Sequence, residues 1–436
     1  MAALQERIET REMTGFQILT IGICTFLNML DGFDILVMSF AAPAVAAEWG
    51  LSNSEIGLLL SAGLFGMGVG AFFVGPIADK VGRKPIVILS LTLITFGMLA
   101  SYWSPSQDAL AVFRFITGIG VGGMIASLNT LVSEFSSRKR RSLAVTILQT
   151  GNPVGATIGG LLSVYLIANF GWRETFLFGG LISLAMLPVL IFVLPESIDF
   201  LASSRRKNAL ERINSIFGKL KLEPVTTLPP VEATVTDGGG FASNYRQLVT
   251  GENRTKTVLI SLSFFLVMFS FYYTMSWTPK LLSDAGYAMS AAISGSVLLN
   301  IGGAIGALVL GFYAGRLGLK RGVGFYMVAT AIFMALFGLF SGELVTAFVI
   351  ALGLGFFLFG SIIGLYAVAP EIFDVQLRAT GIGIAIGVGR IGAVLAPILA
   401  GVLLDTGIQP SIMFIIFGLP MLVCFAAQRA IKYEAS

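Results

Sequence analysis

The sequence predicts an all-α membrane protein with twelve transmembrane helices in two pseudo-symmetric six-helix bundles. Three observations predict this fold: the composition, the recurrence of long apolar runs and an internal repeat. Hydrophobic residues occupy 56% of the 436 positions and charged residues only 12%, which is about half the charged fraction of a soluble domain. Apolar runs of about 20 residues, the length that crosses a bilayer as a helix, recur from one end of the chain to the other.

Twelve apolar runs give the predicted transmembrane helices. Their ranges are 15–47, 53–79, 84–103, 107–135, 141–168, 173–194, 255–283, 288–314, 321–340, 343–371, 378–404 and 410–430. The basic residues concentrate at the two ends of the chain and in alternate loops, whereas the opposite loops hold only Arg173 and Lys280. Because basic loops stay on the cytoplasmic side, we expect both termini and the central loop to be cytoplasmic.

The longest polar interruption divides the chain into three parts. We expect an N-terminal six-helix bundle at 1–194, a cytoplasmic linker at 195–254 and a C-terminal six-helix bundle at 255–436. Within the linker, Ser203–Leu220 places basic residues opposite Leu210, Ile213, Ile216 and Phe217. This pattern predicts an amphipathic helix on the cytoplasmic face of the membrane. Residues 223–242, with their prolines and glycines, predict a flexible connection.

An internal repeat supports the two-bundle architecture. Residues 75–84 (GPIADKVGRK) align without gaps with residues 311–320 (GFYAGRLGLK), each directly after a predicted helix. Further on, Glu134 and Arg141 recur as Glu371 and Arg378. Duplicated halves are typical of secondary transporters, whose substrate site lies between the halves near the middle of the membrane.

The repeat also supplies candidate gating residues. Asp79 and Arg83 are spaced to form an acid–base latch at the cytoplasmic mouth, while the second copy has a glycine and a leucine at these places. Gly75 and Gly82 indicate a fixed backbone role in addition to topology. We interpret Glu134 with Arg141, and Glu371 with Arg378, as ion pairs between loops that favour one state of the gate.

Charged residues inside the apolar runs are the main functional signal. Asp31 and Asp34 lie midway along the first helix, and Asn28 extends their face by one turn. Ionised groups at this depth cost several kcal/mol and normally mark an ion or substrate pathway. Arg114 and Arg390, inside the fourth and eleventh helices, are the cationic counterparts. The alternative is a purely structural pairing of these acids and arginines.

The same sequence argues against several other classes of protein. It has no nucleotide-binding loop, no cluster of His or Cys ligands for a metal and no nucleophile with a base, so we expect neither an enzyme nor a cofactor. The chain contains no histidine, and any proton transfer must therefore use carboxylates, with Tyr or Lys as further possibilities. The net charge of +4 lies in loops, where it reports topology and does not indicate nucleic-acid binding.

With these residues in view, the chain resembles the major facilitator superfamily. The carriers of the resemblance are GPIADKVGRKP at 75–85, Arg114 in RFITGIGVGG, the glycine-rich stretch that starts at Gly151, and Pro195-Glu196-Ser197. Within that superfamily, DGFD at 31–34 and the stretch 370–401 resemble the aromatic acid:proton symporters. The resemblance implies import of benzoate-like acids, such as 4-hydroxybenzoate and protocatechuate, through a bacterial inner membrane. Related members take phenylpropionates, muconate, gentisate or nicotinate.

The resemblance and the charged residues together suggest a division of tasks. We expect Asp31, Asp34 and Arg114 to couple transport to protons, with the two acids titrating as a pair. Arg390 is the first candidate to bind the substrate carboxylate, because its planar fork matches a carboxylate, and Arg114 is the second. Asn28 and aromatic walls would complete the binding site. The aromatic candidates are Phe269, Tyr272, Tyr273, Trp277 and Tyr366, for each of which packing is the alternative interpretation.

Other functions remain open at this stage. The chain could transport another small organic acid such as muconate or nicotinate, export amphipathic compounds, or act as a membrane sensor for aromatic acids. The expected partners are a small aromatic carboxylate, protons and the lipid bilayer. By resemblance alone, we expect the protein to work as a monomer.

Overall fold

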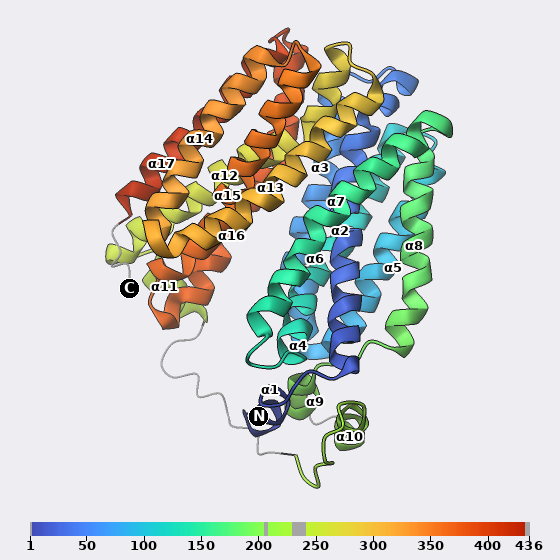
Figure 1. Cartoon of the computed structure of the whole chain (residues 1–436), viewed down its shortest axis with the longest axis vertical. Coiled ribbons are helices and arrows are strands. Elements are labelled where there is room, and N and C mark those ends of the chain that lie inside the picture. The colour runs from blue at the N-terminus through green and yellow to red at the C-terminus, as the bar shows by residue number, and fades with distance from the viewer. Residues whose placement is uncertain (1, 205–207, 229–240, 432–436) are drawn as a thin grey trace. The chain divides into compact units, whose positions relative to one another are not determined.

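The computed structural model describes residues 2–204, 208–228 and 241–431, and this part of the chain is helical, without a β-strand. Twelve of its helices are long and apolar enough to cross a membrane, which confirms the predicted number of spans (Figure 1). The spans are formed by α2 (Gly15–Trp49), α3 (Asn53–Val69) with its continuation to Val81, α5 (Arg83–Tyr102), α6 (Gln107–Glu134), α7 (Arg141–Asn169), α8 (Arg173–Phe192), α12 (Gly251–Asp284), α13 (Met289–Leu317), α14 (Leu319–Phe340), α15 (Leu344–Ile372), α16 (Val375–Asp405) and α17 (Pro410–Ala430).

The second span is not one continuous α-helix, as its apolar run predicted. After α3 the backbone forms a π-helix at Gly70–Val74 and a 3₁₀ turn at Gly75–Ile77, before the short α4 (Ala78–Val81). Gly70 packs against the backbone of Ile119 in α6, where no side chain would fit. Pro76 has no N–H to continue the α-helical hydrogen bonds. A hydropathy pattern reports neither the close packing of Gly70 nor the missing N–H of Pro76, so it could not predict this interruption.

The chain divides into two compact units. Unit 1 comprises Met1–Ile35, Phe65–Gly155 and Phe176–Val235, and unit 2 comprises Leu36–Leu64, Ala156–Thr175 and Thr236–Ser436. The helices α2, α3 and α7 therefore each contribute to both units. Neither unit begins or ends at residue 194 or 255, where we predicted boundaries. The three-part organisation along the sequence stays a prediction.

Each unit has its own packed interior. In unit 1, α5 packs along α6, and Gly120 lets α6 lie against the backbone at Ser90. In unit 2, α12 packs along α16, α13 along α15, and α14 along α17. The buried side chains of this second interior include Phe264, Met268 and Met327. Apolar side chains elsewhere remain exposed, as expected for helices whose outer faces meet lipid.

Three short helices of unit 1 lie together beside the start of α2 and the end of α8: α1 (Ala2–Glu9), α9 (Ile198–Ser204) and α10 (Ala209–Lys219) (Figure 1). Helix α10 is the amphipathic helix that the sequence predicted. Its apolar residues Ile213 and Phe217 are fully buried by protein, and Arg7 of α1 lies 5.4 Å from the centre of the Phe217 ring. The expected docking of this face onto the membrane is therefore wrong.

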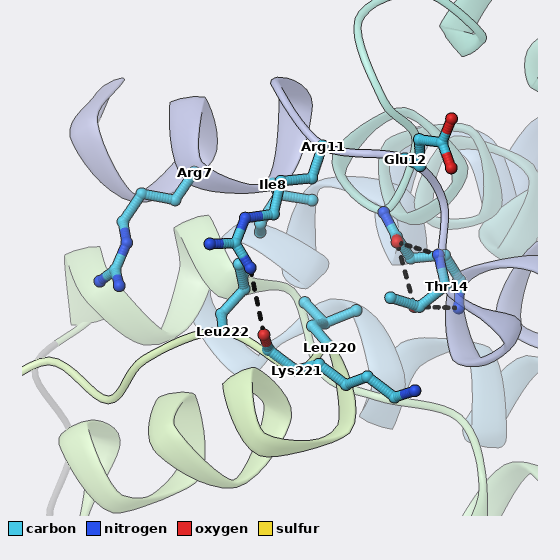
Figure 2. Close-up of a pocket in the computed structure, with 9 residues that line it drawn as sticks. Arg7, Ile8, Arg11, Glu12, Thr14, Leu220, Lys221 and Leu222 are labelled. Atoms are coloured by element: carbon cyan, nitrogen blue, oxygen red, sulfur yellow. Dashed lines mark hydrogen bonds between the residues drawn. The ribbon is translucent and has the colours of Figure 1, made fainter.

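A cavity of about 270 Å³ lies between α1, the start of α2 and residues 220–222 (Figure 2). Arg11 donates to the carbonyl oxygen of Lys221 at 3.3 Å, as Figure 2 shows, and Arg7 donates to that of Glu223 at 3.0 Å. These bonds attach the N-terminal helix to the segment after α10. The predicted flexible stretch 223–242 falls largely on residues 229–240, which lie outside the described residues.

The internal repeat is visible in the backbone. Gly82 precedes α5 with φ of 117°, and its counterpart Gly318 precedes α14 with φ of 79°. L-residues with side chains rarely adopt such angles, so the glycine at this place of the repeat is required in both halves. The same argument does not hold for Gly75, because its φ is −53° and the space around it is open.

Candidate functional site

The first candidate site is the group of buried polar residues on α2 and α6 in unit 1. The side chains of Asp31, Asp34 and Arg114 are almost completely buried. Arg114 donates from Nη1 to Asp34 Oδ1 at 2.9 Å and from Nη2 to the backbone oxygen of Asp34 at 2.6 Å. The predicted pairing of Arg114 with the acids of the first helix is thus confirmed for Asp34.

Further contacts hold the Arg114 guanidinium in place. Nη1 also donates to the Met98 sulfur at 3.2 Å, and the guanidinium carbon lies 5.6 Å from the centre of the Phe176 ring. A guanidinium that is 2% exposed depends on its partners for stability, because a buried charge that loses its counter-ion is costly. Asp34 and Arg114 therefore form one electrostatic element.

Close backbone packing fixes the rotation of α2 that turns the acids inward. A Cβ on Gly155 of α7 would overlap the backbone of Met29, and one on Gly32 would overlap the backbone of Asn152. Asn28 adds a hydrogen bond from its Nδ2 to the Leu148 carbonyl oxygen at 2.6 Å. Asn28 thus lies on the acidic face, as predicted, but its amide binds α7. This observation favours a positioning role over direct substrate contact.

The second candidate site is formed by α12, α15 and α16 in unit 2. Arg390 Nη1 donates to the Tyr272 hydroxyl at 3.2 Å, and Tyr366 lies close enough to interact electrostatically with both. Tyr366 is 38% exposed, and its ring meets Phe264 edge-on at 5.1 Å between centroids. One guanidinium and two phenols, on an apolar aromatic wall, match the chemistry of a hydroxylated aromatic acid.

The other aromatic candidates on α12 lie in the interior of unit 2. Trp277 is fully buried, and its indole N–H donates to the Pro397 carbonyl oxygen at 3.2 Å. Tyr273 is also fully buried and stacks on Phe417 at 4.0 Å, while Phe269 stacks on the same ring at 4.8 Å. In this conformation Trp277 and Tyr273 cannot contact a substrate, so the packing interpretation holds for them here.

The loop before α5 contains the predicted latch. Arg83 Nη2 lies 2.6 Å from Asp79 Oδ1, which confirms the ion pair. The sequence reasoning missed the neighbouring role of Glu196, although it noted the Pro195-Glu196-Ser197 motif. Its Oε1 accepts from the backbone N–H groups of Arg83 at 2.8 Å, Lys84 at 3.0 Å and Ser197 at 2.9 Å. Glu196 therefore fastens the segment after α8 to the start of α5.

The predicted pairing of Glu134 with Arg141 is wrong for this structure. The Glu134 carboxylate accepts from Ser197 Oγ at 2.7 Å and from the backbone N–H of Ile198 at 3.0 Å. Arg141 instead forms its ion pair with Glu9 of α1. A buried carboxylate at the start of α9 is stabilised by the free N–H groups there, which explains the preference.

The second copy of this motif differs from the first. Glu371 and Arg378 are both exposed, and no ion pair joins them within the part of the chain that the structure describes. Their proposed gating role stays a prediction. Exposed ion pairs contribute little stability in any case.

A second feature that the sequence reasoning missed is a helix pairing inside unit 2, between α3 and α16. The Asp405 carboxylate at the end of α16 accepts from the backbone N–H groups of Asn53 at 3.0 Å and Ser54 at 2.8 Å. One turn further into α3 and two turns back along α16, a Cβ on Gly57 would lie 2.5 Å from the Pro397 oxygen. Asp405 thus caps a helix that is about 350 residues away in sequence, which no local pattern can show.

The start of α3 also has its own cap. Ser52 donates from its backbone N and its Oγ to Glu55 Oε2, each at 2.8 Å, as in a capping box. The next two backbone N–H groups, those of Asn53 and Ser54, are not used by this cap and donate to the Asp405 carboxylate. Two turns beyond, Ser61 Oγ donates to the Val394 oxygen at 2.7 Å. The contacts with α16 thus recur every four residues along α3, at Asn53, Gly57 and Ser61.

Metal chemistry finds no support among the described residues, which contain no group of three or more His, Cys, Asp or Glu placed to hold an ion.

Comparison with known proteins identifies the family. The model of the Major Facilitator Superfamily matches residues 21–363. The chain belongs to the major facilitator superfamily. It is therefore a multi-pass membrane transporter and not an enzyme.

Three curated relatives are similar over nearly their whole length. A gallate transporter of Pseudomonas putida is 34% identical over 98% of this chain and 94% of its own. A 4-hydroxybenzoate transporter of Acinetobacter baylyi is 33% identical over 98% and 92%. A gentisate transporter of Corynebacterium glutamicum is 30% identical over 93% and 85%. Each of these relatives is named for a hydroxylated aromatic acid.

Solved structures confirm the fold at low sequence identity. A bacterial homologue of the human lysosomal transporter Spinster, described as inward-facing, has a TM-score of 0.74 at 18% identity over 98% of this chain and all of its own. The xylose transporter of Escherichia coli, in a partially occluded inward-open form, has a TM-score of 0.75 at 17% identity over 97% and 99%. These similarities show the major facilitator fold.

Proposed function

We propose that this protein imports aromatic carboxylic acids of the benzoate, 4-hydroxybenzoate and protocatechuate class, together with protons, by alternating access. The observation that carries the proposal is the similarity over nearly the full chain to transporters of gallate, 4-hydroxybenzoate and gentisate. The Arg390–Tyr272–Tyr366 group supports it, because it combines a carboxylate-binding cation with phenol groups and an aromatic wall.

In this proposal Arg390 binds the substrate carboxylate. The Tyr272 hydroxyl orients the guanidinium through the bond at 3.2 Å, and a phenol such as Tyr366 can donate to or accept from a ring hydroxyl. Hydroxyl groups are what distinguish gallate, gentisate and 4-hydroxybenzoate from benzoate. The group therefore suits hydroxylated acids better than bare hydrocarbon rings.

The proton-coupling role falls to α2 and α6. Entry of an anion against a negative interior costs about 2.3 kcal/mol per charge per 100 mV, and a co-transported proton removes this cost. Asp31 and Asp34 are buried carboxylates on one helix, and Arg114 binds Asp34. Protonation of Asp34 would weaken its pairing with Arg114, which gives the protein two electrostatic states of the same element.

The proposed setting is a bacterial inner membrane with both termini in the cytoplasm, because the basic loops lie on one side of the twelve spans. The Asp79–Arg83 pair, Glu134 and Arg141 would then act at the cytoplasmic ends of the helices, with Glu371 and Arg378. The Asp405 cap, at the opposite end of the spans, would act at the outer ends. Alternating access requires such contacts to break and re-form during each cycle.

Uptake into proteoliposomes tests the proposal. Radiolabelled gallate, 4-hydroxybenzoate and benzoate are offered with and without an inward proton gradient, to wild type, Asp31→Asn and Asp108→Asn. Asp108 is an exposed aspartate in the first turn of α6 and serves as the control. We expect gradient-driven accumulation in wild type and the control, and its loss in Asp31→Asn.

Two other results would change the proposal. Uptake that equilibrates but does not accumulate, in wild type and Asp31→Asn alike, would keep the substrate class and refute proton coupling. Uptake of none of the acids by wild type would refute the aromatic-acid assignment. The same assay with nicotinate addresses the alternative that the protein transports another small organic acid.

A further inference from the structure

A second cavity lies on unit 1, at the end of α5 that follows the Asp79–Arg83 loop. It has a volume of about 510 Å³. One wall is the start of α5, including Pro85, Leu89 and Thr92. The opposite side is formed by Phe200 of α9 and Arg212 of α10. The helices after α8 thus overhang one face of a membrane-spanning helix.

The wall on α5 belongs to the face of this helix that meets lipid. Pro85, Leu89, Thr92 and Phe96 are all exposed, and they are separated by four, three and four residues, so they form one stripe along the helix. Leu89 is 46% exposed and Phe96 is 55% exposed. Because α5 is apolar along its length, this stripe is where acyl chains would lie, and the cavity sits at one end of it.

The other end of the cavity is basic. Lys84 and Arg212 line it, and Lys219 is near enough to repel Lys84 together with Arg212. Lys84 donates one N–H to the Ile191 carbonyl oxygen at 2.7 Å. Neither Lys84 nor Arg212 makes an ion pair with a carboxylate among the described residues. Among the described residues that line the cavity, the fold therefore places two cations with a single carboxylate, Glu196.

The one carboxylate in the lining does not cancel this charge. Glu196 attracts Lys84, but its Oε1 already accepts three backbone N–H groups, from Arg83, Lys84 and Ser197. Two cations therefore face one carboxylate that is largely satisfied by the backbone, with a third cation close by. A phosphate ester would supply the missing negative charge, and Arg and Lys are its usual ligands.

From this arrangement we infer that the cavity binds an anionic phospholipid, with the phosphate between Lys84 and Arg212 and an acyl chain along the Leu89 face of α5. The apolar stripe and the basic end are adjacent, and this is the polarity of a lipid at the interface of a bilayer. A free phosphate would use only the basic end. A zwitterionic lipid carries its own cation and would leave the excess charge of the site uncompensated.

Native mass spectrometry of the full-length protein, purified and delipidated in a neutral detergent, measures this binding. The protein is titrated with phosphatidylglycerol and, separately, with phosphatidylcholine of the same chain length. The test variants are Lys84→Met with Arg212→Met, and Leu89→Gln. The matched control is Arg138→Met with Lys139→Met, which removes two exposed cations from the loop after α6. Melting curves verify that every variant is folded.

We expect wild type and the control to bind one phosphatidylglycerol in preference to phosphatidylcholine. A basic residue near an anionic surface contributes a factor of about five, so the double variant should bind phosphatidylglycerol about 25-fold more weakly. Leu89→Gln should weaken binding several-fold, because it disturbs only the chain. The inference is wrong if the double variant and the control lose the same affinity. It is also wrong if inorganic phosphate displaces the lipid at equal concentration, since the site would then bind a free anion.

Discussion

Replacing Arg114 by glutamine removes one half of the buried pair with Asp34, and the cost should be large. The side chains of Arg114 and Asp34 are each only 3% exposed. Removal of one partner of such a pair leaves an uncompensated charge and costs about 3–5 kcal/mol. Asp34→Asn likewise leaves the buried Arg114 guanidinium without the carboxylate that pairs with it. The double variant removes both charges of the pair, so its loss of stability should fall well below the sum of the two single losses, with a coupling energy of about 2 kcal/mol or more.

The measurement is the free energy of unfolding in mixed micelles, by denaturant titration, for wild type, both single variants and the double variant. The pair of Arg173 and Glu48 provides a matched cycle. Its atoms are closer, at 2.6 Å, but its side chains are 33% and 42% exposed. Exposed pairs contribute about 0.2–1 kcal/mol. Equal coupling energies in the two cycles would refute the argument that burial gives the Arg114 pair its strength.

The same variants separate a structural pair from a functional one. A double variant that recovers stability yet no longer accumulates substrate under a proton gradient supports the coupling role of the pair. Accumulation at the wild-type level in the double variant would make the pair purely structural and would leave Asp31 as the coupling carboxylate of α2.

Further predictions address the remaining elements. Arg390→Lys should raise the half-saturation concentration for 4-hydroxybenzoate about tenfold or more, because lysine lacks the planar fork that binds a carboxylate; an unchanged value would exclude direct binding. Asp405→Ala should lower the free energy of unfolding by about 1 kcal/mol, because it removes a helix cap; a melting assay measures this loss. Gly57→Ala should lower the melting temperature through its overlap with Pro397, whereas Gly68→Ala, which has open space, should not. Partial burial raises the pKa of Asp199 in the folded protein above its value in the unfolded chain. Between these two pKa values the folded chain binds more protons than the unfolded chain, so stability falls as pH rises through that window. Asp199→Asn should therefore stabilise the protein at neutral pH, with no difference from wild type below the usual pKa of aspartate.

The sequence predicted the twelve spans because a bilayer imposes their length and apolarity on every one of them. It also placed Asp34 and Arg114 correctly as buried counterparts, since charges in apolar runs stand out against their surroundings. The Asp79–Arg83 pair followed from spacing along a helix. These successes share one feature: the signal lies in a single segment or in a contrast with the membrane.

The failures share the opposite feature. The periodicity of α10 showed that one face is apolar, but it could not show that protein covers that face instead of lipid. Glu134 lies near Arg141 in sequence, yet the carboxylate binds the start of α9, which arrives from 64 residues away. Trp277 is an aromatic on a membrane helix, but its side chain is fully buried and its indole N–H binds the Pro397 carbonyl oxygen, 120 residues away. In each case the deciding partner is distant along the chain.

The division of α2 between the two compact units adds a physical reason for the location of the acids. Unit 1 ends on this helix at Ile35, the residue after Asp34, and unit 2 begins at Leu36. An α-helix transmits rotation and translation along its axis because every turn is hydrogen-bonded to the next. Asp34 is therefore the last buried charge of unit 1 before α2 becomes part of unit 2, and Arg114 holds it there with two hydrogen bonds. In the proposed function, a proton on Asp34 would weaken this pairing next to the residue at which α2 passes from one unit to the other.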